Sequence, residues 1–540
     1  MPHSTHQQSA SSPAERRRLR VPADDGGVLI EPPPSEAESV IRTNKIRLSA
    51  IHDVEMQGRT LGHMREQARS ELVASAFRYT SEVRPHASFP DKPSSIILTG
   101  HQPELFHPGV WVKNFVAADI AKRTGGIAIN LIVDNDNCES ASVRVPVQTE
   151  NGIRFDRITI DEPQPSQPWE ERQVVSRDQL ASFGDRVSKK LAPFGIKNPI
   201  ASQLAFSEPR KRLADTLTAA RVELESERGV ENLELPVSRL CQSESFLRFL
   251  CHMLVNIEHF HEVHNRVLVE YRQRNNLRSK THPVPALEPQ DGWWEAPFWS
   301  WREGEHVRNR LFAKQLSPKV LAISDGTRVL AELPVGPGMD ACCAVEVLMQ
   351  LASAGERIRT RALTTTIFSR LLFGDLFIHG IGGAKYDEMT DEILREFYGV
   401  EPPEFMTVSA TLRLLGDRAS NVELQDIENL QVRDRNLKFN AQDELANSQD
   451  DFVRELVAEK QRLIAEQQRF DGTNPGGNHQ RYHRFREINK QLAKHTVVER
   501  EAIEKEIETL RIELHQNELL QSRDMSFCLF PLERLDAVIG

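Results

Sequence analysis

The stretch from residue 95 to residue 136 constrains the fold more than any other part of the chain. It reads as a short apolar strand at 95–99, a helix with apolar residues at helical spacing at 110–123, and a second apolar strand at 127–133. A strand, a helix and a strand in this order form a parallel pair with a right-handed crossover. Ligands bind beyond the carboxyl ends of such strands, so the two loops that follow them are the first places to look for a site.

The chain has 540 residues, whereas a single core rarely grows past about 250–300 residues, so we expect more than one structural unit. Shifts in composition mark the boundaries. The sequence predicts a disordered tail at 1–38, the first part of an α/β core at 39–140, inserted connecting segments at 141–355, the second part of the core at 356–420, a long helical hairpin at 421–522 and a C-terminal return to the core at 523–540.

Within these segments the pattern predicts several further elements. Residues 238–274 read as one long helix, and residues 342–354 and 364–373 as two shorter ones. Asp325-Gly326 is a hairpin turn signal between two apolar runs. The apolar run at 525–531 reads as a last strand of the core.

The region 421–522 is rich in Glu, Gln, Arg and Leu, with apolar residues at coiled-coil spacing. The seam residues are Leu445, Phe452, Leu456, Leu463 and Phe470 in one arm and Ile503, Ile507, Leu510 and Leu514 in the other. The Gly- and Pro-rich cluster at 471–477 separates the arms, and residues 496–498 interrupt the second. We therefore expect an antiparallel coiled-coil hairpin.

Composition excludes several classes of protein. The net charge of −10 argues against a nucleic-acid binder, and no apolar run approaches the roughly 18 residues that a membrane helix needs. The six cysteines contain no CxxC pair and are too sparse for a disulfide scaffold. We expect a cytoplasmic protein that acts on a small molecule, with no nucleic-acid or membrane partner.

The loop after the first strand carries the densest group of polar side chains. His101, Gln102 and His107 lie between Gly100 and Gly109, at the start of the predicted helix. A helix N-terminus offers free N–H groups and a partial positive charge, and histidines there can stabilise phosphate or carboxylate. The alternative is that Pro and Gly only shape a tight turn that the histidines cap.

The loop after the second strand is acidic. Asp134, Asp136 and Glu139 follow it, and carboxylates at this spacing can bind Mg²⁺ or orient an amine. An ordinary Asx turn would explain the same residues. We assign Asp134 and Asp136 to catalysis and assign no residue specifically to a metal.

A glycine-rich turn at 379–385 is the third candidate. It lacks the Gly-Lys-Ser/Thr ending of a Walker loop and the spacing of the dinucleotide fingerprint. Its glycines still allow the backbone to approach an anion, so Gly380, Gly382, Gly383 and Lys385, together with Gly100 and Gly109, are the predicted cofactor-binding residues.

Two further clusters favour structural readings. The histidines of the predicted long helix, among them His261 and His264, fit a solvated helix face better than a metal site, because no HExxH pattern is present. The Trp-rich stretch at 293–301 fits a core or an interface better than ligand contact.

Taken together, these motifs resemble the bacillithiol synthase family, the cysteine-adding ligases of low-molecular-weight thiol synthesis. Gly100, Gln102 and Leu105 match the family's first loop, Asp134, Asp136 and Glu139 match its acidic turn, and Gly382-Gly383 resemble its paired glycines. The resemblance implies a Rossmann-like core related to the nucleotidylyltransferases, with inserted segments and a coiled-coil hairpin that forms a homodimer. It also implies a ligase that adds cysteine or another amine to a sugar-derived acid such as glucosaminyl-malate, with ATP or ADP as the cofactor.

The chain departs from the family in the same loop. His101 stands in place of Gln, Glu104 in place of Gly and His107 in place of a small residue, and Pro108-Gly109 inverts the usual Gly-Pro. We therefore expect a divergent member that uses a different amine or acid.

Two other functions remain open at this point. Residues 106–109 resemble the start of the His-x-Gly-His turn of nucleotidylyltransferases, although Val110 stands where the second His belongs. The chain would then release pyrophosphate from a nucleotide. Alternatively, it is a dimeric scaffold without activity, in which the hairpin grips a partner and the core is degenerate.

Overall fold

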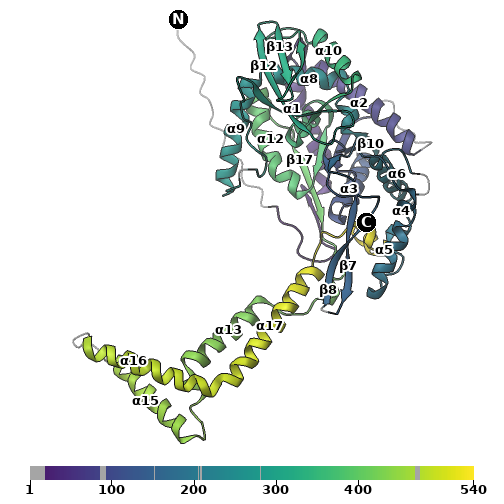
Figure 1. The fold of residues 1–540 in the computed structure, drawn as a ribbon. Helices are drawn as coiled ribbons and strands as arrows, with labels where there is room; N and C mark the ends of the chain where they lie inside the picture. Colours follow the sequence, from purple (N-terminus) through teal and green to yellow (C-terminus); the bar gives the residue numbers. More distant parts are fainter. Residues whose placement is uncertain are drawn as a thin grey trace. The chain divides into compact units, whose positions relative to one another are not determined.

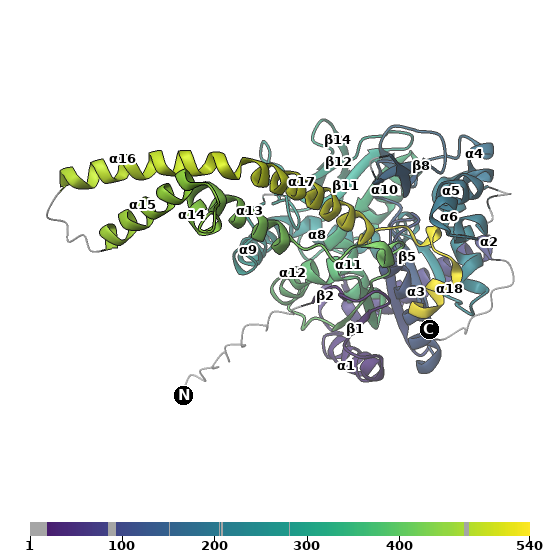
Figure 2. The ribbon, with the colours of Figure 1, turned by 90° about the horizontal axis from the view of Figure 1, so that it is seen from below.

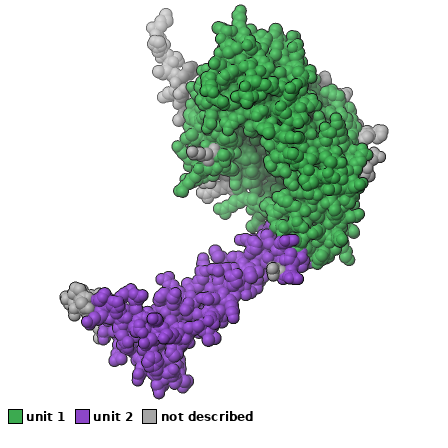
Figure 3. Space-filling model, viewed as in Figure 1, with its two compact units in different colours: residues 1–147, 155–412, 523–540 green, residues 148–154, 413–522 purple. Residues whose placement is uncertain are grey.

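The computed structural model describes residues 19–84, 93–150, 152–204, 206, 209–279, 281–468 and 475–539. The chain forms two compact units, drawn in green and purple in Figure 3. Unit 1 comprises residues 1–147, 155–412 and 523–540, and unit 2 comprises residues 148–154 and 413–522. No helix in the described ranges is both long and apolar enough to cross a membrane.

Unit 1 is built on a six-stranded sheet, visible with its flanking helices in Figure 1. Its strands, in spatial order, are β1 (Val28–Glu31), β17 (Phe405–Ala410), β16 (Leu376–His379), β4 (Ile96–His101), β5 (Ile127–Ile132) and β10 (Leu233–Pro236). All of these pairings are parallel except that of β1, which runs antiparallel to β17 at one edge. The predicted parallel strand pair with its connecting helix α3 (Pro108–Thr124) is confirmed.

The connections leave the middle of the sheet in opposite directions. The chain passes from β4 through α3 to β5 on one side, and from β16 through α12 (Ile381–Tyr398) to β17 on the other side. Because such crossovers are right-handed as a rule, this order places the two helices on opposite faces. The face that α12 covers shares one apolar core with α2 (Leu61–Val83) and α8 (Glu244–Val255).

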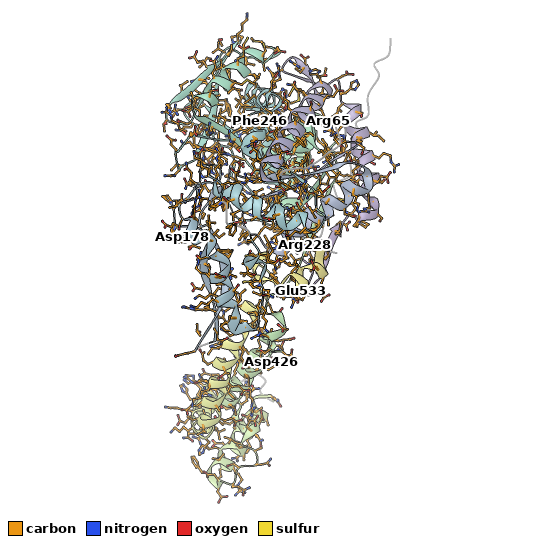
Figure 4. All side chains as sticks on the ribbon, turned by 90° about the vertical axis from the view of Figure 1, so that its right-hand side faces the viewer. Arg65, Asp178, Arg228, Phe246, Asp426 and Glu533 are labelled. Atoms are coloured by element: carbon orange, nitrogen blue, oxygen red, sulfur yellow. The ribbon has the colours of Figure 1, made fainter. Side chains whose placement is uncertain are left out.

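A buried carboxylate fixes β4 beside β16. Asp375 precedes β16 and is 2 % exposed; its Oδ2 accepts a hydrogen bond of 2.8 Å from the backbone N–H of Ile96, the first residue of β4. Arg65 and Arg69 of α2 donate to the same carboxylate at 2.7 and 3.0 Å. Figure 4 labels Arg65 among the side chains of unit 1.

A second sheet of unit 1 is antiparallel. Its order is β14 (Val329–Leu333), β13 (Val320–Ser324), β12 (Asn309–Ser317), β11 (Trp294–Arg302) and β15 (Glu356–Thr360). The predicted turn at Asp325-Gly326 joins β13 and β14, and Gly326 has the positive φ of +88° that such a turn requires. Strand β11 shifts register between Ala296 and Trp299, and a bulge of this kind changes where the following side chains point.

Several predicted boundaries are wrong. The predicted tail at 1–38 contains β1, which belongs to the main sheet, while residues 1–18 lie outside the described residues. The predicted insertion at 141–355 contains β10, which also belongs to that sheet. The long helix expected at 238–274 is three helices, α7 (Val237–Leu240), α8 and α9 (Ile257–Arg274), because Ser243 caps α8 and Asn256 ends it.

The last predicted strand is also wrong. Residues 525–530 are buried, but the segment forms the 3-10 turn η7 (Phe527–Leu529), followed by helix α18 (Leu532–Ile539). The Ser526 hydroxyl accepts a hydrogen bond from the backbone N–H of Cys528, which stabilises the turn. A short apolar run is compatible with either conformation, so its pattern could not decide between them.

Unit 2 contains two helix pairs, and Figure 2 shows α15 beside α16 and α13 beside α17. The helices are α13 (Leu424–Phe439), α14 (Ala441–Glu444), α15 (Asp451–Gln468), α16 (Pro475–Leu492) and α17 (Val497–Leu520). Predicted seam residues Leu456 and Leu463 lie in one apolar cluster, and Ile503 and Ile507 in another. The 3-10 turn η6 (Ala493–Thr496) divides α16 from α17 beside the predicted interruption, and residues 469–474 lie outside the described residues.

We predict that Asp375→Asn destabilises the protein by about 3 kcal/mol, because it leaves two arginines beside a neutral, buried amide. Chemical denaturation followed by circular dichroism measures the loss. Glu404→Gln is the control: it removes a part-exposed ion pair with Arg47 on the same unit and should cost less than about 1 kcal/mol. Equal losses in the two variants would show that Asp375 is not the anchor of β4.

Candidate functional site

A cavity of about 880 Å³ opens in unit 1 at the carboxyl ends of the parallel strands. Gly100, His101 and Gln102 line it from β4 and its loop, and His379 and Gly380 line it from β16. The neighbours β4 and β16 are the strands whose helices leave in opposite directions. Ligands of open α/β sheets bind in the crevice that forms at such a point.

The two histidines of the first loop face this cavity as neutral rings. His101 ends β4, and burial, with the nearby Lys113, lowers its pKa to about 3. His107 precedes α3, and burial, with Arg523, lowers its pKa to about 4. Both Nδ1 atoms are buried and form no hydrogen bond with any described residue. At neutral pH these rings can therefore hydrogen-bond a ligand but add no fixed charge.

The acidic loop divides its carboxylates between the cavity and the interior. Asp136 lines the cavity. Its carboxylate accepts a hydrogen bond of 2.9 Å from Gln102 Nε2 and forms an ion pair with Arg308 Nη2 at 3.0 Å. The loops that follow β4 and β5 thus meet between Gln102 and Asp136, as neighbouring parallel strands allow.

Asp134 does not line the cavity, and the catalytic role predicted for it does not fit its position. Its carboxylate accepts hydrogen bonds from the backbone N–H and hydroxyl of Ser238 and is 4 % exposed. Burial, with the nearby Glu170, raises its pKa to about 7. Glu139, expected in the same acidic turn, is exposed and accepts a hydrogen bond from Ser166.

The predicted glycines fall into two groups. A Cβ at Gly100 would lie 2.7 Å from the backbone oxygen of Leu131, and one at Gly109 would lie 2.4 Å from that of Ala410. Close backbone packing therefore accounts for both. Gly380 and Gly382, at the start of α12, would meet nothing within 4 Å, so they leave the end of this helix open to the cavity. Gly383 and the exposed Lys385 line the cavity beside them.

Lys113 was missed by the sequence analysis. It lies on the buried face of α3, lines the cavity, and donates one hydrogen bond of 2.7 Å to the backbone oxygen of Gly100. Burial lowers its pKa to about 7. No local pattern distinguishes a buried lysine on such a helix from a solvated one.

The antiparallel sheet supplies the opposite wall, which the sequence analysis also missed. Trp299, beyond the bulge in β11, lines the cavity with Arg361 4.2 Å from its ring and Arg308 4.9 Å away. The carboxylate of Glu295 holds Arg361 Nη1 at 2.8 Å. The Nε and Nη2 atoms of Arg361 are buried and have no hydrogen-bond partner among the described residues.

His264, which was expected on a solvated helix face, also lies elsewhere. His264 of α9 is 3 % exposed and lines the cavity, and burial lowers its pKa to about 4. The Trp-rich stretch was read as core or interface, and Trp301 is indeed buried, whereas Trp299 contacts the cavity.

The charge of the lining favours an anion. Among the described residues, five basic side chains line the cavity against two carboxylates: Lys113, Arg308, Arg361, Lys385 and Arg523 against Asp136 and Asp524. The hydroxyls of residues 364–366 each donate to a backbone oxygen, so they offer the cavity acceptor lone pairs and not protons. The described residues contain no group of three His, Cys, Asp or Glu side chains placed to hold a metal ion.

Comparison of the sequence with family models and with curated proteins finds no match.

We predict that Lys113→Met stabilises the protein by up to about 4 kcal/mol at pH 6. Below about pH 7 both the folded and the unfolded chain protonate Lys113, so the cost of burying its charge is fully present. Between about pH 7 and the usual lysine pKa only the unfolded chain carries the proton, so the wild type gains stability as pH rises and the advantage of the variant shrinks.

Denaturation midpoints at pH 6, 8 and 10 measure this dependence. Lys122→Met, on the exposed face of the same helix, is the matched control and should show no such trend. A difference between Lys113→Met and wild type that stays constant across the range would contradict the lowered pKa.

Proposed function

We propose that this protein is a ligase of the bacillithiol synthase type, which joins cysteine or another amine to a small sugar-derived acid such as glucosaminyl-malate. The observation that carries the proposal is the pair of unpartnered donors on Arg361, fixed in the wall of a cavity with basic lining. The strand order β17-β16-β4-β5-β10 supports a Rossmann-like core for this enzyme, because it reverses at the strand where the cavity lies.

Arg361 is suited to one carboxylate of the acid. Its Nε and Nη2 atoms form one edge of the guanidinium, and this edge matches the two oxygens of a carboxylate. Glu295 and the ring of Trp299 hold the group in place, so little conformational freedom is lost when a ligand binds. His101, His107 and Lys385 then lie in the same cavity for further anionic or hydroxyl groups of the substrate.

Asp136 is suited to the amine. Its side chain is 40 % exposed, and Gln102 and Arg308 fix its orientation. A carboxylate held in this way can accept hydrogen bonds from a substrate ammonium while the basic residues bind the acid. The two ligand charges would then be oriented along one cavity, which brings the reacting groups together.

We propose ATP or ADP as the cofactor. Lys113 and His107 line the cavity near the start of α3 and could contact phosphate oxygens. When bound, a nucleotide would supply a phosphate that activates a carboxylate. Gly109 leaves no extra room for it, since the backbone of Ala410 fills the space beside it.

A nucleotidylyltransferase is the second candidate, because the unpartnered Nδ1 of His107 lies at the beginning of α3, as expected of the first His of that turn. Val110 supplies no second imidazole there. This candidate requires the release of pyrophosphate from ATP or CTP, whereas the ligase requires loss of free amine and formation of a thiol product.

For the assembly, we propose a homodimer formed through a coiled-coil hairpin in unit 2. Apolar side chains that remain exposed on its helices support this surface: Leu424, Val432, Phe439, Phe452, Val498 and Ile512. Light scattering should give twice the chain mass of 61.4 kDa. A monomer at micromolar concentration would exclude the dimer without bearing on the cavity.

We predict that Arg361→Gln weakens binding of glucosaminyl-malate by about tenfold to a hundredfold, because a charge-assisted hydrogen bond contributes about 1.5–3 kcal/mol. Isothermal titration calorimetry measures the dissociation constant, and mass spectrometry follows the thiol product formed with cysteine.

Arg310→Gln is the matched control. Arg310 binds the other oxygen of Glu295 at 3.0 Å but does not line the cavity, so each variant leaves Glu295 with one arginine. We expect wild-type affinity from Arg310→Gln. Wild-type affinity from Arg361→Gln, or no binding of the acid to the wild-type protein, would refute the proposed substrate class.

A further inference from the structure

His379 occupies a rigid position in the wall of the cavity. It is the last residue of β16 and is 5 % exposed. Its ring stacks on Phe377 at a centroid distance of 4.3 Å and meets the edge of Phe405 at 5.0 Å. Two aromatic contacts at different angles leave the imidazole little freedom to rotate. The ring therefore presents a fixed pair of nitrogen atoms.

One of these nitrogens faces a buried ion network. His379 Nε2 lies 2.9 Å from Oδ2 of Asp387, which is 1 % exposed. Arg370 Nη1 donates to the same oxygen at 2.6 Å, and its Nη2 donates to Asp391 at 2.6 Å. Burial opposes ionisation of Asp387, but Arg370 and His379 outweigh it and hold the pKa of this carboxyl well below its usual range. His379 Nε2 forms no hydrogen bond with the described residues, but an ionised carboxylate 2.9 Å away favours the tautomer in which Nε2 carries the proton.

The other nitrogen is then a free proton acceptor. A Cβ at Gly383, in the first turn of α12, would lie 3.0 Å from Nδ1 of His379. The absence of a side chain at Gly383 therefore keeps a Cβ from crowding this atom. Gly382, one residue earlier, would meet nothing within 4 Å. Of the two glycines, only Gly383 lies where an added side chain would contact His379.

We propose that His379 is a catalytic residue whose Nδ1 removes a proton from the substrate ammonium, with Asp387 and Arg370 as positioning residues. This inference rests on the proposed function and adds the proton acceptor that the reaction requires. One ammonium N–H bond breaks, and its proton binds the Nδ1 lone pair. The amine keeps the electron pair as a lone pair on its nitrogen, Asp387 stabilises the imidazolium, and the proton then leaves to solvent.

A substrate-free experiment tests whether Nδ1 is accessible. Diethyl pyrocarbonate modifies unprotonated imidazole nitrogens, and peptide mass spectrometry gives the rate at each histidine. The exposed His52 serves as the internal reference. We expect Gly383→Ala to slow modification of His379 at least fivefold and Gly382→Ala to leave its rate unchanged. Both substitutions raise helix propensity alike, so a change in helix stability would affect them equally. Equal rates in the two variants would overturn the inference.

The catalytic role itself is tested by turnover of cysteine and glucosaminyl-malate. His379→Gln should lower kcat at least a hundredfold with KM within about threefold of wild type, because proton removal and not binding is lost. Asp387→Asn should lower kcat less, and its folding is checked by circular dichroism. Wild-type kcat in His379→Gln would overturn the inference while leaving the proposed function standing. Failure of the wild-type protein to turn over any of these substrates would refute the proposed function. In that case the labelling rates would still test whether Nδ1 of His379 is accessible.

Discussion

The side-by-side pairing of β4 and β16 is the constraint on which the rest of the structure depends. Asp375 joins the start of both strands to Arg65 and Arg69 of α2 through buried, charge-assisted hydrogen bonds. With these strands adjacent, the right-handed crossovers must carry α3 and α12 away in opposite directions. Neither helix can cover the carboxyl ends of β4 and β16, so a cavity forms where the strands end.

The two sheets of unit 1 contribute different chemistry to that cavity. The parallel sheet contributes groups that hydrogen-bond, namely the imidazoles of His101 and His379 and the open start of α12. The antiparallel sheet contributes fixed charge through Arg308 and Arg361, which flank Trp299. The cavity thus places fixed positive charge for an acidic substrate opposite imidazole nitrogens that can hydrogen-bond it.

The sequence alone was sufficient for what depends on local pattern. The parallel strand pair and its polar loops were found, because strand periodicity and turn residues lie within a short stretch of chain, whereas the glycine-rich turn predicted at 379–385 is in fact the first turn of α12. The rule that parallel strands end at one edge placed the two polar loops together, but the hydrogen bond between Gln102 and Asp136 was not predicted. Asp134 was misjudged because its carboxylate turns inward to Ser238, a residue about one hundred positions away in sequence.

What could not be predicted depends on which distant segments meet. Arg361 acquires its role from Glu295 and Trp299, and these contacts arise only when β11 pairs with β15. The low pKa of Lys113 comes from burial beneath β4, which its position on an amphipathic helix does not reveal. The β1 strand and the helical C-terminus were missed because short apolar segments take their conformation from the surface against which they pack.

A crystal structure of the protein with glucosaminyl-malate tests the central claim most directly. The account predicts a carboxylate of the ligand within about 3 Å of both Nε and Nη2 of Arg361, with the ligand amine between Asp136 and His379. A ligand bound outside this cavity, or an Arg361 edge already occupied by another part of the chain, would contradict it.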